Sequence, residues 1–411
     1  MISQCPVFTD PLNPVSDEFL ENPYPKFAEM RAKSPIIWSK KGKYWLVSSY
    51  EIASEITKDL HFEKRLERWN QISPIARILP GPAKLIKNRQ SWMLNQNPPE
   101  HTHLRSLVNK AFSPKMIKGM QAHIQSIADR LIDKVAASGK IEFISEYAFL
   151  LPITVIAEML GIPSQDHDNF KEWSHAITQT VDPGYGRDLL NKANDANDKL
   201  KNYLRPLLNE RRRNPQEDLI TALLFAEENG EKLSEEDVLG NIILMLVAGH
   251  ETTVNLIGNG ILALLRHPEQ LKLLQNDPSL IESAVEECLR YDSPVQSVKR
   301  LASRDMEYRG QKLKKGDMLI VLLGACNRDP AVFKDPDNFD ITRKENKHLA
   351  FSSGIHHCLG ATLARIEGQI AINSILKRLP DLHLVEQKLE HKRPFNLRGL
   401  KQIQLEFSPR A

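Results

Sequence analysis

One cysteine stands in a setting that can support chemistry. Residues 351–360 read FSSGIHHCLG, a glycine-containing loop that leads to Cys358 where a helical pattern begins. A helix N-terminus carries partial positive charge and free N–H groups, and both stabilise a thiolate. Because Gly354 and Gly360 lack side chains, a flat ligand can approach the sulfur closely. Such a thiolate can attack an electrophile or bind a soft metal. A buried structural cysteine is the plainer alternative.

A zinc site is a weaker alternative for the same loop. His348, His356 and His357 lie near Cys358 in the sequence and are zinc-ligand types. They lack the paired C-x₂-C or H-x₃-H spacing of structural zinc sites. The sequence therefore favours a single-cysteine site.

A second signal is a polar break inside an apolar segment. Residues 238–265 are apolar almost all round, which predicts a buried helix, yet the centre reads AGHETT from Ala248 to Thr253. Burying Glu251 and Thr252 without partners costs free energy. The Thr252 hydroxyl can bond back to a carbonyl one turn earlier and bend the helix. Such a break also suits a site where dioxygen binds and is protonated.

Two pairs of charged or proton-donating residues have helical spacing. Glu287 and Arg290 are three residues apart, so they share one helix face. His101 and Arg105 are one turn apart, and together they can grip a carboxylate. Solvated surface pairs are the alternative for both.

The surrounding pattern predicts a mainly helical protein with small sheets. We expect one domain over 1–411, with a helix-rich body at about 98–300 and 345–380 and β-rich parts at about 35–60, 300–325 and 380–411. Apolar runs around Lys40–Lys43 predict a β-hairpin, and 306–313 and 318–323 read as two strands. Residues 63–97 are rich in proline and read as a lid loop.

Composition excludes several classes of protein. Hydrophobic residues make up 41% and charged residues 26% of the 411, with a net charge of +3, as in an ordinary globular protein. No apolar run is long enough for a membrane span, and the balanced charge gives no reason to expect nucleic-acid binding. Four scattered cysteines fit a reducing cytoplasm. A monomer is the default expectation.

These motifs together resemble the cytochrome P450 family. The cysteine loop fills every fixed position of the family pattern F-x-x-G-x-H-x-C-x-G, with Ser352 where glycine is frequent. The resemblance extends from about Pro23 to the C-terminus and is strongest to the soluble bacterial branch of macrolide hydroxylases and the biotin-synthesis enzyme. It implies a triangular-prism fold, with heme b between the central helix and the helix after the cysteine loop.

The resemblance also implies roles for individual residues. Cys358 is the iron ligand, and a thiolate there favours O–O cleavage. Thr252 stabilises the reduced dioxygen, and Glu251 relays protons from solvent. Glu287 and Arg290 form a structural pair, in which Asn338 replaces a usual cation. The heme-binding set is His101, Arg105, Ala248, Arg300, Phe351, His356, Cys358 and Gly360. The candidate substrate wall is Ile78, Leu79, Val247, Val295, Val298 and Leu397.

The implied activity is hydroxylation of an apolar molecule by O2, the substrate being a macrolide, polyketide, steroid, terpenoid or fatty acyl chain. The chain carries no flavin or nicotinamide fingerprint, so a ferredoxin or flavodoxin with its NAD(P)H reductase must supply electrons. Complementary charge suits an acidic donor to a basic face of Lys110, Lys347, His348 and Arg365. A peroxide-driven peroxygenase and a heme sensor are the alternatives. The Glu251–Thr252 pair disfavours a peroxygenase. A heme sensor needs neither that pair nor a substrate lid.

Overall fold

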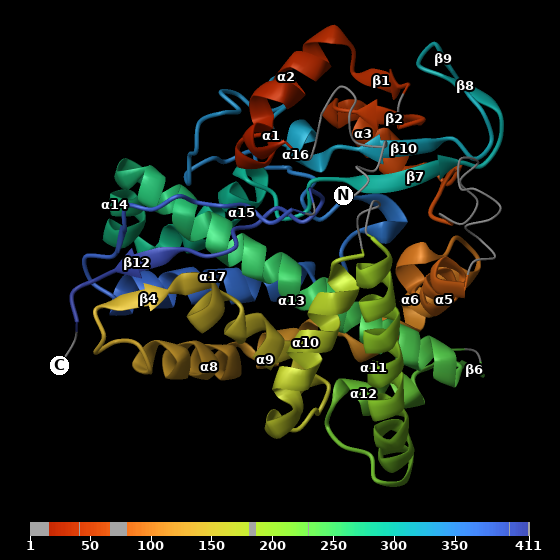
Figure 1. Cartoon of the computed structure of the whole chain (residues 1–411), viewed down its shortest axis with the longest axis horizontal. Helices are drawn as coiled ribbons and strands as arrows, with labels where there is room; N and C mark the ends of the chain where they lie inside the picture. Colours follow the sequence, from red (N-terminus) through yellow and green to blue (C-terminus); the bar gives the residue numbers. More distant parts are fainter. Residues whose placement is uncertain are drawn as a thin grey trace.

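A computed structural model describes residues 16–40, 42–65, 80–180, 186–228, 230–393 and 395–409. The chain is mainly helical, with small sheets beside the helical body (Figure 1). Ile78 and Leu79 of the expected lid loop lie outside the described residues.

The helices follow the periodic segments of the sequence. They are α1 (Asp17–Glu21), α2 (Tyr24–Lys33), α3 (Tyr50–Lys58), α5 (Pro80–Gln90), α6 (Glu100–Ala111), α7 (Pro114–Gly119), α8 (Gln121–Asp133), α9 (Leu150–Met159), α10 (His167–Thr178), α11 (Arg187–Arg213), α12 (Leu219–Phe225), α13 (Glu235–Arg266), α14 (Pro268–Asn276), α15 (Ile281–Tyr291), α16 (Leu323–Cys326) and α17 (Ala361–Arg378). Among these described helices, none is both long and apolar enough to cross a membrane.

The strands are short. They are β1 (Ile36–Ser39), β2 (Tyr44–Val47), β3 (Phe62–Glu63), β4 (Lys140–Glu142), β5 (Glu227–Glu228), β6 (Glu231–Lys232), β7 (Val298–Ala302), β8 (Met306–Tyr308), β9 (Gln311–Leu313), β10 (Met318–Val321), β11 (His383–Leu384) and β12 (Gln404–Glu406). The largest sheet has the order β1-β2-β10-β7-β3, and the predicted hairpin is its β1–β2 pair.

The central helix α13 organises the helical body. It starts after the N-cap Ser234, whose side chain accepts from the Asp237 N–H, and three acidic residues in its first turn complement the helix dipole. Its side chains are buried on nearly every face, as the apolar sequence predicted. In Figure 1 it crosses the middle of the molecule in green, with the blue α17 alongside.

The largest sheet joins distant parts of the chain. β10 pairs in parallel with β2 of the N-terminal hairpin and antiparallel with β7 (Figure 1). β3 pairs with the other edge of β7, with Glu63 opposite Leu301. Lys64, which follows β3, is thereby brought near Arg300 of β7.

Three sequence expectations need correction. The segment expected to be a lid loop contains α5, because prolines at its start fit the first turn of a helix, where the missing N–H is not needed. The strand expected at 306–313 is the β8–β9 hairpin, which turns at Arg309 and Gly310 with φ of 51° and 74°. The last helix begins at Ala361, three residues after Cys358.

Glu287 and Arg290 of α15 form a fully buried ion pair, as expected. The guanidinium donates to both carboxylate oxygens at 2.8 and 2.7 Å. It also donates to the carbonyl oxygens of Asn327, Pro336 and Asn338 at 2.7–3.0 Å. Every N–H that points away from Glu287 thus finds a carbonyl, which offsets the cost of burying the charge.

The network around this pair is larger than expected. The sequence predicted a pair plus the amide of Asn338, but Asn338 contributes its backbone carbonyl. Arg343 supplies a second cation, with its Nε 3.2 Å from Glu287 Oε2. Asn327 extends the network to the cysteine segment, because its side-chain oxygen accepts from the Leu349 N–H at 2.6 Å.

Replacing Glu287 with alanine tests this brace. The Glu287→Ala variant leaves Arg290 buried without its counter-charge, so we expect the free energy of unfolding to fall by about 3–5 kcal/mol. Urea denaturation measures that change. Glu282→Ala on the exposed face of the same helix is the matched control, with an expected change of about 0.5 kcal/mol. Equal effects of the two variants would contradict the brace.

Candidate active site

The cysteine loop is held by backbone contacts at both ends. The Cys358 N–H donates to the Phe351 carbonyl at 3.0 Å, and Gly360 is the N-cap of α17. Gly354 has a φ of 71°, and a Cβ there would lie 2.4 Å from the Thr57 carbonyl oxygen of α3. Only glycine fits both the conformation and the space. Cys358 is therefore presented at a fixed place just before α17.

Ser352 occupies a backbone conformation that favours glycine. Its φ is 59°, and its buried hydroxyl has no hydrogen-bond partner among the residues that the structure describes. A left-handed conformation at a residue other than glycine costs about 1 kcal/mol or more. The departure from the frequent glycine therefore strains the loop, without touching the sulfur.

Burial raises the pKa of the Cys358 thiol. The amide of Gly360 and the guanidinium groups of Arg105 and Arg365 oppose that rise in pKa. Both influences are consistent with a sulfur that ionises when a cation binds to it. His348 pairs with Glu286, and the His356 ring lies against His101 at a tilt of 56°. The described residues contain no group of three or more metal-ligating side chains, so the zinc alternative gains no support.

The predicted carboxylate-binding residues converge from three elements. The rings of His101 in α6 and His356 in the cysteine loop have centroids 4.2 Å apart. Arg105 and Arg300 both act on His356 electrostatically. Sequence analysis missed Lys64, which is buried and acts on His101 and His356, while the charges of Arg300 and Lys299 help burial to lower the pKa of Lys64 itself. The antiparallel pairing of β3 with β7 brings it there, and no sequence spacing signals that.

This cluster is positive and, within the described ranges, no carboxylate pairs with any of its five members. Burial and the neighbouring charges of Arg105 and Lys64 lower the pKa of His101 to about 4. Burial lowers the pKa of Arg300 to about 10, and its buried Nη2 has no hydrogen-bond partner in the described part of the chain. A buried guanidinium needs an acceptor. The cluster therefore fits an anionic ligand such as the two propionates of heme b.

The polar break in α13 exposes a narrow face of an otherwise buried helix. Ala248 and Gly249 are exposed, although Val247 and His250 on either side are buried. A Cβ placed on Gly249 would meet no atom within 4 Å. The Thr252 hydroxyl donates to the Ala248 carbonyl at 2.8 Å, as the sequence suggested. These small and polar residues leave room for a flat ligand against the helix.

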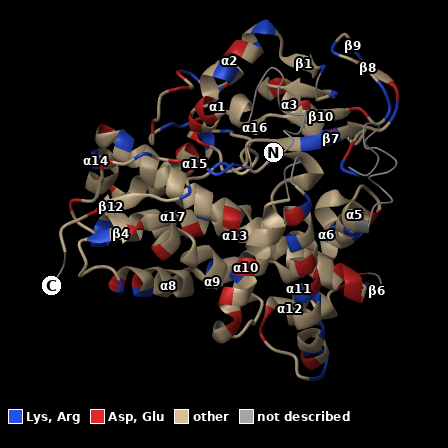
Figure 2. Cartoon of the chain, in the orientation of Figure 1, with Lys and Arg blue, Asp and Glu red and all other residues tan. Residues whose placement is uncertain are grey.

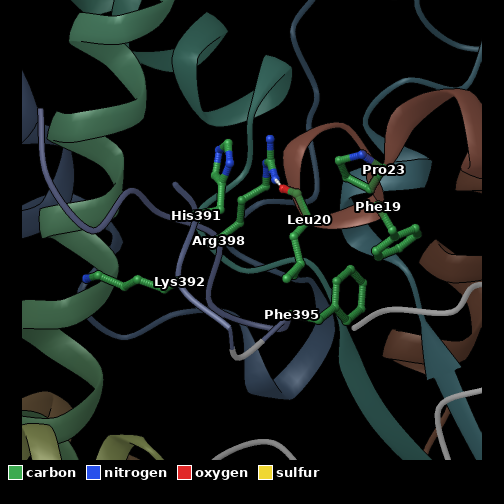
Figure 3. Close-up of a pocket in the computed structure, with 7 residues that line it drawn as sticks. All are labelled: Phe19, Leu20, Pro23, His391, Lys392, Phe395 and Arg398. Atoms are coloured by element: carbon green, nitrogen blue, oxygen red, sulfur yellow. Dashed lines mark hydrogen bonds between the residues drawn. The ribbon is translucent and has the colours of Figure 1, made fainter. Parts of the chain in front are cut away.

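Glu251 points to a different side of α13 from Thr252. Its side chain is buried and pairs with Lys392, whose Nζ lies 2.5 Å from Oε1. Figure 3 shows the Lys392 amine projecting away from the other labelled residues, toward a helix that this contact identifies as α13. Burial alone raises the pKa of Glu251, but the charges of Lys392 and His250 outweigh it and lower the pKa. Sequence analysis missed Lys392, which is distant in the chain.

A second buried carboxyl lies against α13. Glu367 of α17 is hydrogen-bonded to Thr253, and burial raises its pKa to about 8. It therefore remains protonated at neutral pH. Glu367 looks like an ordinary helix residue in the sequence, so no local signal could have found it.

The structure brings two of the candidate substrate-wall residues together. Val295 and Leu397 form an antiparallel bridge, which places the segment after α15 beside the C-terminal segment. Val298 begins β7 and Val247 is buried in α13. The pocket drawn in Figure 3 lies elsewhere, between α1 and the C-terminal segment, and has a volume of about 10 Å³. It is too small for an organic substrate.

The basic residues expected to meet an electron donor are largely paired. Glu286 accepts from both His348 and Arg365, at 3.1 and 2.6 Å. The Lys110 Nζ lies 3.8 Å from Glu228 in the acidic β5–β6 hairpin (Figure 2). Lys347 is exposed, and its backbone carbonyl accepts a hydrogen bond from the Tyr50 hydroxyl.

Comparison with known proteins identifies the class. The cytochrome P450 family model matches residues 37–406, and the chain belongs to the cytochrome P450 family, the heme-thiolate monooxygenases that hydroxylate organic substrates. It is 41% identical over 394 residues to the biotin biosynthesis cytochrome P450 of Bacillus subtilis, covering 95% of this chain and 98% of that one. The vitamin D(3) 25-hydroxylase of Pseudonocardia autotrophica is 39% identical, with 96% of each chain covered.

Solved structures agree with the fold. The crystal structure of P450BioI in complex with a hexadec-9Z-enoic acid-ligated acyl carrier protein has a TM-score of 0.89, with 41% identity, 95% of this chain covered and 99% of that chain. The expected mainly helical fold and the biotin-synthesis branch are both confirmed.

Replacing Arg300 tests the anion site. We expect Arg300→Gln to weaken heme retention by roughly tenfold to a hundredfold, because a hydrogen bond to a charged group contributes about 1.5–3 kcal/mol. Heme transfer to apomyoglobin measures the loss rate. The exposed Arg304→Gln is the control.

The same assay with heme dimethyl ester separates charge pairing from packing. The ester lacks propionate charge, so we expect wild type to lose it faster than heme and Arg300→Gln to add little further loss. The ratio of the loss rate of the ester to that of heme is compared between the variant and wild type. An equal ratio in the two proteins would contradict carboxylate binding at Arg300.

Proposed function

We propose that this monooxygenase hydroxylates an extended fatty acyl chain. One observation carries the proposal: a solved structure 41% identical to this chain binds an acyl-loaded carrier protein. The apolar bridge of Val295 and Leu397 supports it, because apolar walls suit a hydrocarbon chain.

We propose that Cys358 binds the heme iron and that Lys64, His101, Arg105, Arg300 and His356 hold the propionates. When bound, the heme supplies the iron at which dioxygen is activated. Ala248 and Gly249 leave space against α13 for the ligand and substrate. The Thr252 hydroxyl, fixed by the Ala248 carbonyl, holds a proton at the exposed face of the helix. Glu251 delivers protons from the buried side.

Substrate binding tests the acyl proposal. We expect palmitic acid and its acyl-carrier conjugate to shift the ferric Soret band toward the high-spin form at lower concentration than corticosterone does. Product analysis with surrogate redox proteins then locates the new hydroxyl group. A steroid that bound about tenfold more tightly than either acyl ligand would overturn the substrate class.

We also propose that an acidic ferredoxin or flavodoxin reduces the protein in the cytoplasm by docking over the cysteine loop. Ile355 and His357 of that loop are exposed, and Ile355 retains 37% of its accessible surface. Lys347, eight residues before Ile355 in the chain, is an exposed cation without a carboxylate partner among the described residues. An exposed apolar residue together with an exposed cation suits a small acidic partner.

Charge reversal at Lys347 tests this face. We expect Lys347→Glu to lower the second-order rate of reduction by about two- to fivefold at low salt, with a smaller difference at high salt. Stopped-flow formation of the ferrous–CO complex measures the rate. Lys388→Glu, at a side chain 86% exposed beside β11, is the control. Equal slowing by both variants would contradict docking at the cysteine loop.

A further inference from the structure

His250 carries a buried nitrogen that faces a buried oxygen. Its Nδ1 lies 2.7 Å from the Leu246 carbonyl oxygen, so Nδ1 carries the proton and Nε2 of the neutral ring is an acceptor. Nε2 is 3.7 Å from Glu251 Oε2. Both atoms are buried, and neither has a hydrogen-bond partner among the described residues. Two acceptors therefore face each other without a donor between them.

Lys392 accounts for the orientation of that oxygen. It binds the other carboxylate oxygen, Oε1, and also donates to the Asn255 side chain at 3.3 Å. Asn255 lies one turn after Glu251, so the ammonium bridges two turns of α13. With Oε1 held in this way, Oε2 is turned toward His250.

We propose that His250 Nε2 and Glu251 Oε2 form a shared proton-loading site on α13, and that Lys392 is the positioning residue that keeps the two atoms facing each other. A proton taken from solvent lodges between the nitrogen and the oxygen, and the same proton leaves through Glu251 toward the face that carries Thr252. No electrons move in this step. The inference rests on the proton-delivery role proposed above for Glu251.

The surrounding charges make a loaded proton easy to release. Burial lowers the pKa of His250, Glu251 opposes that shift, and His175 of α10 and Lys392 reinforce it. The imidazole ring also meets the Phe149 ring edge-on, with the two ring centroids 5.5 Å apart. The Lys171 ammonium lies over the same Phe149 ring, 4.8 Å from its centroid. The positive charges around the site therefore outnumber the single negative charge of Glu251. A proton held by His250 is for that reason more acidic than a proton on a free imidazole.

Nitrogen-15 NMR of histidine-labelled protein in the diamagnetic ferrous–CO state tests the site without turnover. We expect the His250 Nε2 signal to titrate while Nδ1 stays protonated. Removing a nearby positive charge raises proton affinity, so Lys392→Met moves the titration to higher pH by roughly one unit. Glu251→Gln moves it to lower pH. An Nε2 that never titrates, or that ignores both substitutions, overturns the proposal.

Coupling measurements test the function of the site. With any substrate that shifts the spin state, we expect His250→Gln and Lys392→Met to release several-fold more hydrogen peroxide per electron pair than wild type, and Lys392→Arg to restore most of the coupling. The ferrous–CO band shows that the heme site is intact in each variant. Wild-type coupling in His250→Gln at every pH overturns the proposal. Failure of the acyl hypothesis appears separately, as absence of acyl product from wild type.

Discussion

A buried positive charge that no carboxylate among the described residues neutralises is the constraint on which this structure depends. Arg300 lies in the sheet with an Nη2 that has no partner in the described part of the chain, and Lys64, His101, Arg105 and His356 gather around it from other elements. Cations in a low-dielectric interior repel one another strongly. A dianionic ligand removes that repulsion, so heme binding and the packing of β3, β7, α6 and the cysteine loop stabilise one another. The residues proposed to hold the propionates would therefore also make the stability of the fold depend on the cofactor.

The Glu287–Arg290 network that supports the cysteine segment differs from this cluster, because its buried charges have partners. Arg290 is just as buried as Arg300, yet its N–H groups meet Glu287 and three carbonyl oxygens. Asn327 then connects this network to Leu349, immediately before the cysteine loop. A fully satisfied polar network holds one arrangement firmly. The sulfur is thus carried by a rigid support, whereas unsatisfied polar atoms occur where a ligand or a proton has to be received.

Sequence reasoning succeeded where the interacting residues are close in the chain. Glu287 with Arg290 and Thr252 with the Ala248 carbonyl are one helical turn apart, so helix geometry alone predicts their contacts. Lys64, Arg343, Lys392 and Glu367 were missed because sheet pairing, loop packing or helix packing brings them to their partners. The sequence pattern does not indicate α5, because its prolines are typical of interruptions although they stand at its first turn. Composition and local spacing do not predict contacts between residues that are distant in the chain.

The division of polar groups around α13 follows from the helix itself. Successive residues are about 100° apart, so Glu251 and Thr252 cannot face the same side, whereas Ala248 and Thr252 can. The exposed side carries Ala248 and Thr252, the buried side carries His250 and Glu251, and Thr253 meets Glu367 on a third. A proton that starts on the buried side must pass around the helix to reach the exposed one. Because Lys392 pins Glu251 on the buried side, the rate of that passage depends on how readily one ion pair opens.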